Sequence, residues 1–141
     1  MHKRTYVDYS EASHEKQVAG RSFTVRYAVV DHFGDKVYYF EEREREHIVP
    51  ERKAKSQGFL IWYLDKVPAI LHTPTEVIVD PEDTTVHIYY KRYKVAENPS
   101  INRLAVVVKN AEVRFVLTFY GHTGRRLKGE TKTKRATYLK R

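Results

Sequence analysis

The sequence contains no cysteine among its 141 residues. A disulfide scaffold, a Cys-ligated metal or iron–sulfur site and a cysteine nucleophile are therefore excluded. Long apolar runs are also missing, since runs such as Ala105–Val108 and Phe115–Leu117 are far too short to span a bilayer. No apolar stretch follows the basic residues in Met1–Tyr9, so we expect no secretory signal peptide. These absences predict a cytoplasmic protein without membrane contacts.

Several well-known catalytic motifs are absent as well. The sequence has no P-loop, no GxGxxG, no His-Glu-x-x-His or other close histidine pair, and no Gly-x-Ser-x-Gly elbow. We therefore expect no metal site, no cofactor and no serine nucleophile. Three neighbouring acidic residues, Asp80, Glu82 and Asp83, are interpreted as turn-forming residues rather than as a catalytic carboxylate pair.

The composition indicates one small folded domain with an unevenly placed charge. Hydrophobic residues make up 41% of the chain and charged residues 31%, and the net charge is +8. Residues 123–141 hold eight Lys and Arg against one Glu, whereas the rest of the chain is almost balanced. Such a segment binds phosphate backbones through counterion release or stays solvated. We thus expect a loosely ordered arm (1–22), one domain (23–122) and a basic tail (123–141).

The first half of the domain shows a hairpin followed by helices. Residues 24–30 and 36–40 are β-branched and aromatic, and the turn-forming residues 31–35 separate them. Residues 41–48 are expected to form a short charged helix that ends before Pro50, with a second short piece over 51–56. Apolar side chains recur every three or four positions over Phe59–Leu71, which is typical of an amphipathic helix.

The second half predicts four strands in succession. The β-rich runs are separated by turn-forming residues and cover 76–80, 85–92, 103–109 and 113–120. Short connections between consecutive strands favour an antiparallel meander. The predicted fold class is therefore α+β, with the N-terminal hairpin and the helices packed on one face of a four-stranded antiparallel sheet.

Alternation along these strands assigns their side chains to two faces. We expect one core face made by Val86, Ile88, Tyr90, Leu104, Val106, Val108, Phe115, Leu117 and Phe119. The opposite face then collects cations, hydroxyls and aromatic rings without a carboxylate, namely His87, Tyr89, Lys91, Lys109, Arg114, Thr118 and Tyr120. If Val108 pairs with Phe115, then Lys109 lies opposite Arg114, and a bound anion would offset their repulsion. This face is either a phosphate-binding surface or an ordinary solvated sheet face.

Short motifs in the right order resemble those of a nuclease family. They are the charged helix with His47, the amphipathic helix, Pro74-x-x-Val77, Tyr89-Tyr90-Lys91, Val106-Val107-Val108-Lys109 and Phe115-Val116-Leu117-Thr118-x-Tyr120. The order is similar to that of the phage-type branch of the barnase, EndoU, colicin and RelE-like toxin ribonucleases. The resemblance covers about residues 41–126. It departs from the family pattern at one place, because Arg52 is followed by Lys53 rather than by a second histidine.

The resemblance implies a RelE/barnase-like fold and metal-independent RNA cleavage by attack of the 2′-hydroxyl on the adjacent phosphate. The catalytic residues that it implies are His47, Lys91, Lys109 and Thr118. His47 would act as acid or base, the lysines would stabilise the phosphate, and Thr118 would orient an oxygen. The expected RNA-binding residues are Arg52, Tyr89, Arg114, Tyr120, Arg125, Arg126 and Lys128.

Three functional hypotheses follow from these features. The first is a toxin-type endoribonuclease acting on tRNA, mRNA or rRNA, with an immunity protein or antitoxin as its partner. The second is a non-catalytic nucleic-acid-binding module that uses the same sheet and tail. The third is a phage or mobile-element structural domain that has lost activity, for which the missing second histidine is the main support. His47 is alternatively an ordinary surface histidine in a highly charged segment.

Overall fold

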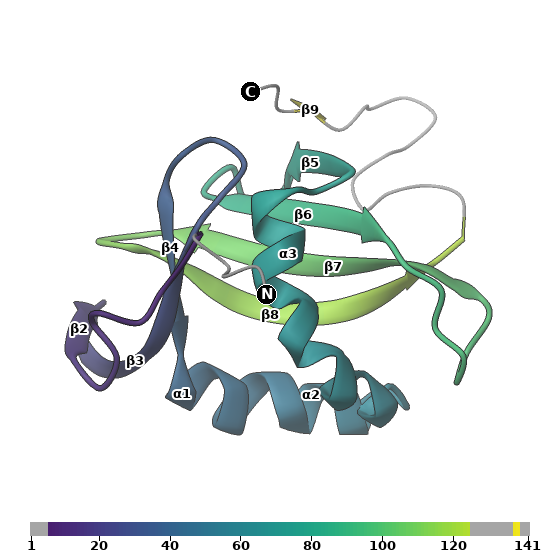
Figure 1. The fold of residues 1–141 in the computed structure, drawn as a ribbon, viewed down its shortest axis with the longest axis horizontal. Helices are drawn as coiled ribbons and strands as arrows, with labels where there is room; N and C mark the ends of the chain where they lie inside the picture. The colour runs from purple at the N-terminus through teal and green to yellow at the C-terminus, as the bar shows by residue number, and fades with distance from the viewer. Residues whose placement is uncertain (1–5, 125–136, 139–141) are drawn as a thin grey trace, which may run out of the picture.

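The computed structural model describes residues 6–124 and 137–138. Within these ranges, nine strands form one mixed sheet of order β1-β3-β4-β8-β7-β6-β5-β9, and β2 pairs separately with β3 (Figure 1). The strands are β1 (Val7–Asp8), β2 (Glu15–Val18), β3 (Arg21–Val30), β4 (Lys36–Phe40), β5 (Glu76–Val79), β6 (Val86–Arg92), β7 (Ile101–Asn110), β8 (Arg114–Thr123) and β9 (Thr137–Tyr138).

The four strands expected in the second half are present and form the antiparallel meander β5-β6-β7-β8. The hairpin expected over residues 24–40 is also present as β3 and β4. Strong local alternation and turn-forming residues define both units. Local pattern therefore predicted these two units, whereas the pairing of β2 with β3 was not predicted.

The predicted fold class was nevertheless wrong in how these units combine. The hairpin does not pack on a face of a four-stranded sheet; instead β4 extends the same sheet by pairing in parallel with β8 at Tyr38 and Phe115. Phe40 and Phe115 lie side by side, with ring centroids 5.6 Å apart, and Phe23 stacks on Phe40 at 5.2 Å. Burying these rings against one another stabilises the junction of the two hairpins. The architecture is a large mixed sheet and not the RelE/barnase-like arrangement.

The N-terminal arm adds strands to the same hairpin. β1 pairs with one half of β3, at Val29 and Ala28, and β2 pairs with the other half, from Thr24 to Arg21. Glu11, between β1 and β2, accepts hydrogen bonds from Lys36 and from the hydroxyl of Tyr38. The ion pair with Lys16, together with these hydrogen bonds, lowers the pKa of Glu11 to about 2.

The helical segments connect β4 to β5. The first runs without a break through α1 (Glu41–Arg43), the π-helical η1 (Glu44–Ile48) and α2 (Val49–Ala54), so Pro50 does not end it. The second comprises the 3₁₀-helical η2 (Gly58–Lys66) and α3 (Val67–His72), with Pro68 in the first turn of α3. Among the described residues, no helix has the length and apolar character needed to cross a membrane.

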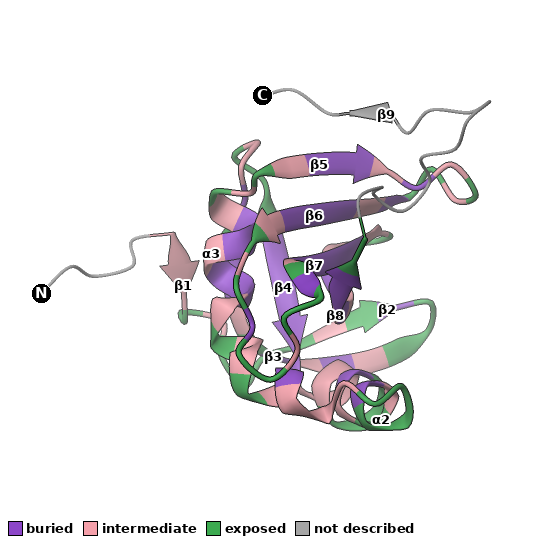
Figure 2. Ribbon diagram, turned by 90° about the vertical axis from the view of Figure 1, so that its right-hand side faces the viewer, coloured by how far each residue is buried: buried purple, intermediate pink, exposed green. Residues whose placement is uncertain are grey.

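The main core lies between α3 and one face of the sheet. Figure 1 shows α3 crossing in front of β6 and β7, while α1 and α2 lie below β8. Ile70 and Leu71 of α3 are fully buried against Tyr89, Val106 and Phe119. Figure 2 shows the buried positions concentrated in α3 and the central strands. We call this side of the sheet the helix face, and the side that carries Tyr90, Ala105 and Tyr120 the far face.

One buried carboxylate ties the β3–β4 turn to the meander. Asp31 is 1% exposed, and its Oδ1 accepts hydrogen bonds from the backbone N–H groups of Phe33 and Asp35. Its Oδ2 accepts the Tyr89 hydroxyl at 2.5 Å and the Arg114 guanidinium at 3.3 Å. A buried charge is tolerated when it is paired and hydrogen-bonded in this way. We call Asp31, Tyr89 and Arg114 the turn latch.

Replacing Tyr89 by Phe should destabilise the fold without creating a cavity. The Tyr89 hydroxyl both donates to Asp31 and accepts from Arg114 at 2.7 Å, so its loss leaves two buried charged groups under-satisfied. We expect the free energy of unfolding to fall by about 1–3 kcal/mol, measured by urea denaturation. Tyr63→Phe is the matched control, since its hydroxyl bonds to Glu97 at the surface. Equal effects of the two substitutions would contradict the importance of the latch.

Candidate functional site

The strand registers divide the predicted polar face between both sides of the sheet. The β6–β7 register places Lys91 and Lys109 on opposite faces, and a β-bulge in β8 separates Arg114 from Thr118. The register between β7 and β8 shifts between Val107 and Val108. Val108 therefore pairs with Val116, and Lys109 pairs with Phe115 rather than lying opposite Arg114. The expected pairing of Val108 with Phe115 was wrong. Of the seven predicted polar-face residues, the helix face receives His87, Tyr89, Lys91 and Arg114, and the far face receives Lys109, Thr118 and Tyr120.

The predicted residues on the helix face take part in structural contacts. The Lys91 ammonium donates to the carbonyl oxygen of Thr73 at 2.6 Å and to its hydroxyl at 2.7 Å, beside the end of α3. Tyr89 and Arg114 belong to the turn latch. His47, in η1, is exposed. The structure therefore does not bring His47, Lys91, Lys109 and Thr118 into one site.

A hollow on the far face gathers other predicted residues. Its volume is about 740 Å³. Three of the residues predicted to bind or cleave RNA line it: Arg52, Thr118 and Tyr120. The complete lining comprises Glu51, Arg52, Lys55, Gln57, Asp80, Glu82, Asp83, Val86, Val107, Leu117, Thr118, Tyr120 and His122. We call it the far-face hollow and treat it as the candidate site.

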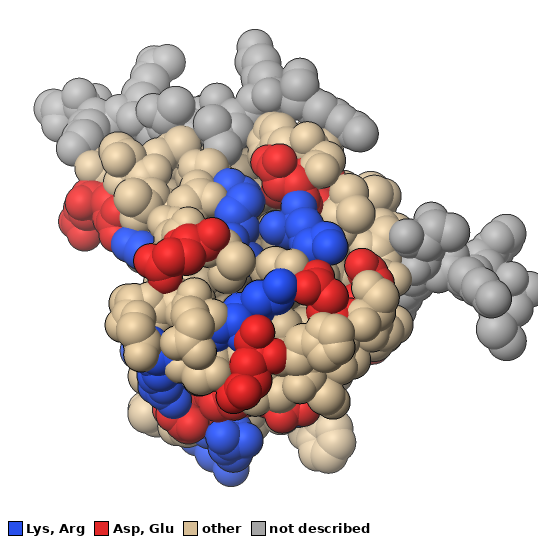
Figure 3. Space-filling view, turned by 90° about the vertical axis from the view of Figure 1, so that its left-hand side faces the viewer, with Lys and Arg blue, Asp and Glu red and all other residues tan. Residues whose placement is uncertain are grey.

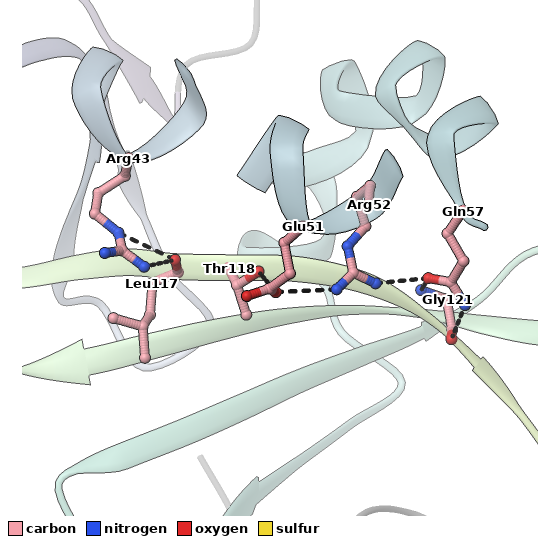
Figure 4. Close-up of polar contacts among 7 residues, drawn as sticks. All are labelled: Arg43, Glu51, Arg52, Gln57, Leu117, Thr118 and Gly121. Carbon is pink, nitrogen blue, oxygen red and sulfur yellow. Dashed lines mark hydrogen bonds and ion pairs between the residues drawn. The ribbon is translucent and has the colours of Figure 1, made fainter. Parts of the chain in front are cut away.

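The helical segment beside β8 forms one wall of the hollow, because β4 leaves much of the β8 edge uncovered. The β4–β8 pairing is limited to Tyr38 and Phe115. Further along the strand, Arg43 donates two hydrogen bonds to the carbonyl oxygen of Leu117, at 2.5 and 3.2 Å. The Gln57 amide both donates to and accepts from the backbone of Gly121, each at 3.2 Å (Figure 4). Side chains thus satisfy backbone groups that a neighbouring strand would otherwise bind.

Close packing at Gly121 keeps this wall against the strand. A Cβ atom placed there would lie 2.7 Å from Cδ1 of Ile101 and 3.1 Å from Cδ1 of Leu60. Both of these residues are buried in the core. Glycine at this position therefore lets η2 approach β8 closely enough for Gln57 to reach the backbone.

Arg52 and Glu51 extend from α2 toward β8. Arg52 is 3% exposed and donates to the Gln57 side-chain oxygen at 2.6 Å and to the Glu51 carboxylate at 3.0 Å (Figure 4). The same carboxylate accepts the Thr118 hydroxyl at 2.8 Å. Burial by itself raises the pKa of Glu51, but the hydrogen bonds from Thr118 and Arg52 outweigh burial and lower it. Glu51 is thus an ionised carboxylate beside an arginine and a hydroxyl.

Aromatic residues and a histidine form the next part of the hollow. The Arg52 guanidinium lies over the Tyr120 ring, 5.9 Å from its centroid. The Tyr120 and Tyr90 hydroxyls are 3.0 Å apart, and the Tyr90 ring meets the His122 ring edge-on at 5.5 Å. Burial and the neighbouring Tyr90 raise the pKa of Tyr120, so its hydroxyl remains protonated. A carboxylate, a cation, a histidine and hydroxyl donors therefore share one concave site.

Lys109 lies beside this site with a carboxylate partner. Its ammonium donates to Asp83 at 2.9 Å and to the Thr85 hydroxyl at 2.7 Å. Hydrogen bonds from Thr85 and Lys109 lower the pKa of Asp83 to about 2. Asp80 accepts the backbone N–H of Glu82, as expected for a turn-forming residue. The acidic residues of the β5–β6 connection thus neutralise the lysine that the sequence predicted to meet phosphate.

Glu51 and His122 are the residues of this site that the sequence reasoning missed. Glu51 immediately precedes Arg52, and α2 turns both side chains toward β8. His122 lies beyond the predicted end of the last strand at residue 120, whereas β8 continues to Thr123. Extending the alternation of Thr118 and Tyr120 by two residues would have placed His122 on the same face.

Other parts of the surface offer less to an anionic ligand. Figure 3 shows basic and acidic side chains intermixed over the β2–β4 side of the molecule. Ion pairs account for much of this pattern, including Arg21 with Glu46 and Arg26 with Glu44. In the part of the chain that the structure describes, no three His, Asp or Glu side chains are grouped so that they could hold one metal ion. Arg125, Arg126 and Lys128 lie outside the described residues.

Comparisons with known proteins found no matching family model, curated protein or solved structure.

His87 should make the stability of the fold depend on pH. It is half-buried on the helix face, and its Nδ1 is buried without a hydrogen-bond partner among the described residues. Burial, assisted by Arg114, lowers the pKa of His87, although Asp31 and Asp35 oppose the shift. The unfolded chain then binds the proton more readily, so stability is complete above about pH 6.5 and decreases as the solution is acidified below it.

Urea unfolding at pH 5.5 and 7.5 tests this expectation. His87→Gln should lose less stability between the two pH values than the unsubstituted protein, because glutamine does not titrate. The same loss in both proteins would assign the pH dependence to other groups.

Proposed function

We propose that the protein is a metal-independent endoribonuclease that cleaves RNA by attack of a 2′-hydroxyl on the adjacent phosphate, and that the far-face hollow is its active site. The observation that carries this proposal is the presence of Glu51, Arg52 and His122 in one hollow. They supply the three chemical functions that the reaction needs, namely a base, a cation and an acid. The resemblance to toxin ribonucleases supports the same reaction through Arg52, Thr118 and Tyr120.

Each residue has a defined part in the proposed reaction. Glu51 takes the proton of the 2′-hydroxyl, and its lowered pKa keeps it ionised for this step. As the 2′-oxygen bonds to phosphorus, Arg52 stabilises the negative charge on the phosphate oxygens. His122 gives a proton to the 5′-oxygen while its bond to phosphorus breaks. The products are a 2′,3′-cyclic phosphate and a free 5′-hydroxyl.

Two hydroxyl groups would orient the substrate. Thr118 donates to Glu51 in the free protein and can turn its hydroxyl toward a phosphate oxygen when substrate enters. Tyr120 keeps its proton, so its hydroxyl is available as a donor at neutral pH. The sequence-predicted catalytic set is thereby revised. Thr118 is kept, Glu51 and His122 replace His47 in acid–base chemistry, and Arg52 replaces Lys91 and Lys109 at the phosphate.

One observation favours the alternative of a nucleic-acid-binding module without catalysis. In the free protein Arg52 is held by Glu51 and Gln57, so a phosphate must compete with a carboxylate for it. A binding module predicts salt-sensitive RNA binding with an intact product, whereas the endoribonuclease predicts a shortened RNA that ends in a cyclic phosphate.

Glu51→Gln should reduce cleavage by a factor of about 10²–10⁴, because glutamine keeps the shape and the hydrogen bonds but cannot accept the proton. The measurement is the rate of cleavage of total RNA in EDTA, with the product ends identified by mass spectrometry. Glu46→Gln makes the same change in the same helical segment, where the carboxylate pairs with Arg21 at the surface, and should leave the rate unchanged.

His122→Gln should cause a comparable loss of activity. The His47→Ala substitution separates this site from the one that the sequence predicted, since a loss with His47→Ala and none with His122→Gln would return the acid–base role to η1. RNA left intact by the unsubstituted protein would refute the proposed activity.

A further inference from the structure

Three basic residues form a row across the far face, next to the hollow. Arg92 of β6 pairs directly with Arg103 of β7, and Arg103 pairs directly with His122 of β8. Tyr90, Ala105 and Tyr120 form the neighbouring row two residues away along the same strands. Because alternate residues share a face, Arg92, Arg103 and His122 lie on the same side as the hollow.

The pairing of two arginines is electrostatically unfavourable in the free protein. Like charges that lie directly opposite each other on adjacent strands destabilise a sheet. Neither Arg92 nor Arg103 makes an ion pair with a carboxylate among residues 6–124. Several other arginines face a carboxylate instead, as Arg26 faces Glu44 and Arg114 faces Asp31. This row is therefore an unusual concentration of uncompensated positive charge.

The hydrogen bonds of Arg103 also indicate an anion-binding role. Its Nη1 donates only to the neighbouring Asn102 side chain, at 3.3 Å, and its Nε is buried with no acceptor among the described residues. A buried guanidinium N–H without an acceptor costs free energy. An anion bound over the row would accept from it and would also screen the repulsion between Arg92 and Arg103.

We infer that Arg92 and Arg103 form a phosphate-binding subsite for the RNA backbone, next to the reactive phosphate. The inference rests on the proposed function, because it takes the substrate of the hollow to be RNA. His122 connects the proposed active site to the subsite, since it lines the hollow and is also the last residue of the row. Adjacent strands lie about 4.8 Å apart, so the row extends about 10 Å from His122. Within that distance, an RNA strand that leaves the hollow passes over both arginines. Their planar guanidinium groups can each bind two phosphate oxygens.

The test measures binding separately from cleavage. A single-stranded RNA with 2′-O-methyl groups cannot undergo attack by its 2′-oxygen, so its affinity can be measured at several salt concentrations by fluorescence anisotropy. For single-stranded nucleic acid, each phosphate contact contributes about 0.7 to the slope of log affinity against log salt. Arg103→Gln and Arg92→Gln should each reduce the slope by about that amount and weaken binding at low salt. Both should remain folded, because each removes half of a repulsive pair.

Lys66→Gln is the matched control. It removes the same charge from η2, in the helical segment that covers the helix face, and should leave the slope unchanged.

The inference is overturned if Arg103→Gln and Lys66→Gln have the same slope and affinity as the unsubstituted protein. If RNA is cleaved but the slope does not respond to Arg103, the subsite fails and the proposed activity stands. If the slope responds but no RNA is cleaved, the subsite stands and the endoribonuclease assignment fails. If the unsubstituted protein does not bind the oligonucleotide, both proposals fail.

Discussion

The buried carboxylate of Asp31 holds together two parts of the chain that are far apart in sequence. Its two oxygens accept from the β3–β4 turn on one side and from Tyr89 and Arg114 of the meander on the other. Backbone pairing between these parts is limited to Tyr38 and Phe115, so the sheet has few hydrogen bonds at this junction. A buried ion pair stabilises little relative to an apolar contact, but an incomplete one is strongly unfavourable. The latch therefore favours one placement of the hairpin over the alternatives.

The position of the β3–β4 hairpin also determines which part of the chain covers the rest of the β8 edge. Because β4 diverges from β8 after one pair, the remaining edge of β8 is open to the helical segment that follows β4. Arg43 and Gln57 bind the backbone there, Glu51 accepts from Thr118, and Arg52 lies over the Tyr120 ring. The chemistry of the far-face hollow thus depends on an edge that the mixed topology creates. In a sheet with full β4–β8 pairing, these polar side chains would have no backbone groups to bind.

The sequence predicted the local units and missed their combination. Alternation located the strands of both hairpins, because each strand carries its own apolar pattern. The single parallel contact of Tyr38 with Phe115 leaves no such pattern and requires a connection of more than seventy residues. The bulge at Val107 and Val108 is equally invisible to alternation, yet it reverses the parity of β8 relative to β7. Thr118 and Tyr120 were correctly placed on one face, whereas the bulge moves Arg114 to the other. Lys91 and Lys109, predicted to share a face, are separated by the β6–β7 register, which pairs Lys91 with Leu104 and Lys109 with Val86.

Cations that pair with a carboxylate have structural roles in this fold, whereas cations without a carboxylate partner are the candidate ligand-binding residues. Lys109, Arg26 and Arg114 each face a carboxylate, and these pairs connect strands, turns and helices. Arg92 and Arg103 face each other instead, in the strand pair next to the hollow. This repulsive pairing lowers the stability of the free protein, and such a pairing persists most readily where another interaction offsets it. The sequence predicted such a repulsive pair at Lys109 and Arg114, from an assumed register. In the actual register the pair is Arg92 and Arg103, and Arg103 pairs in turn with His122.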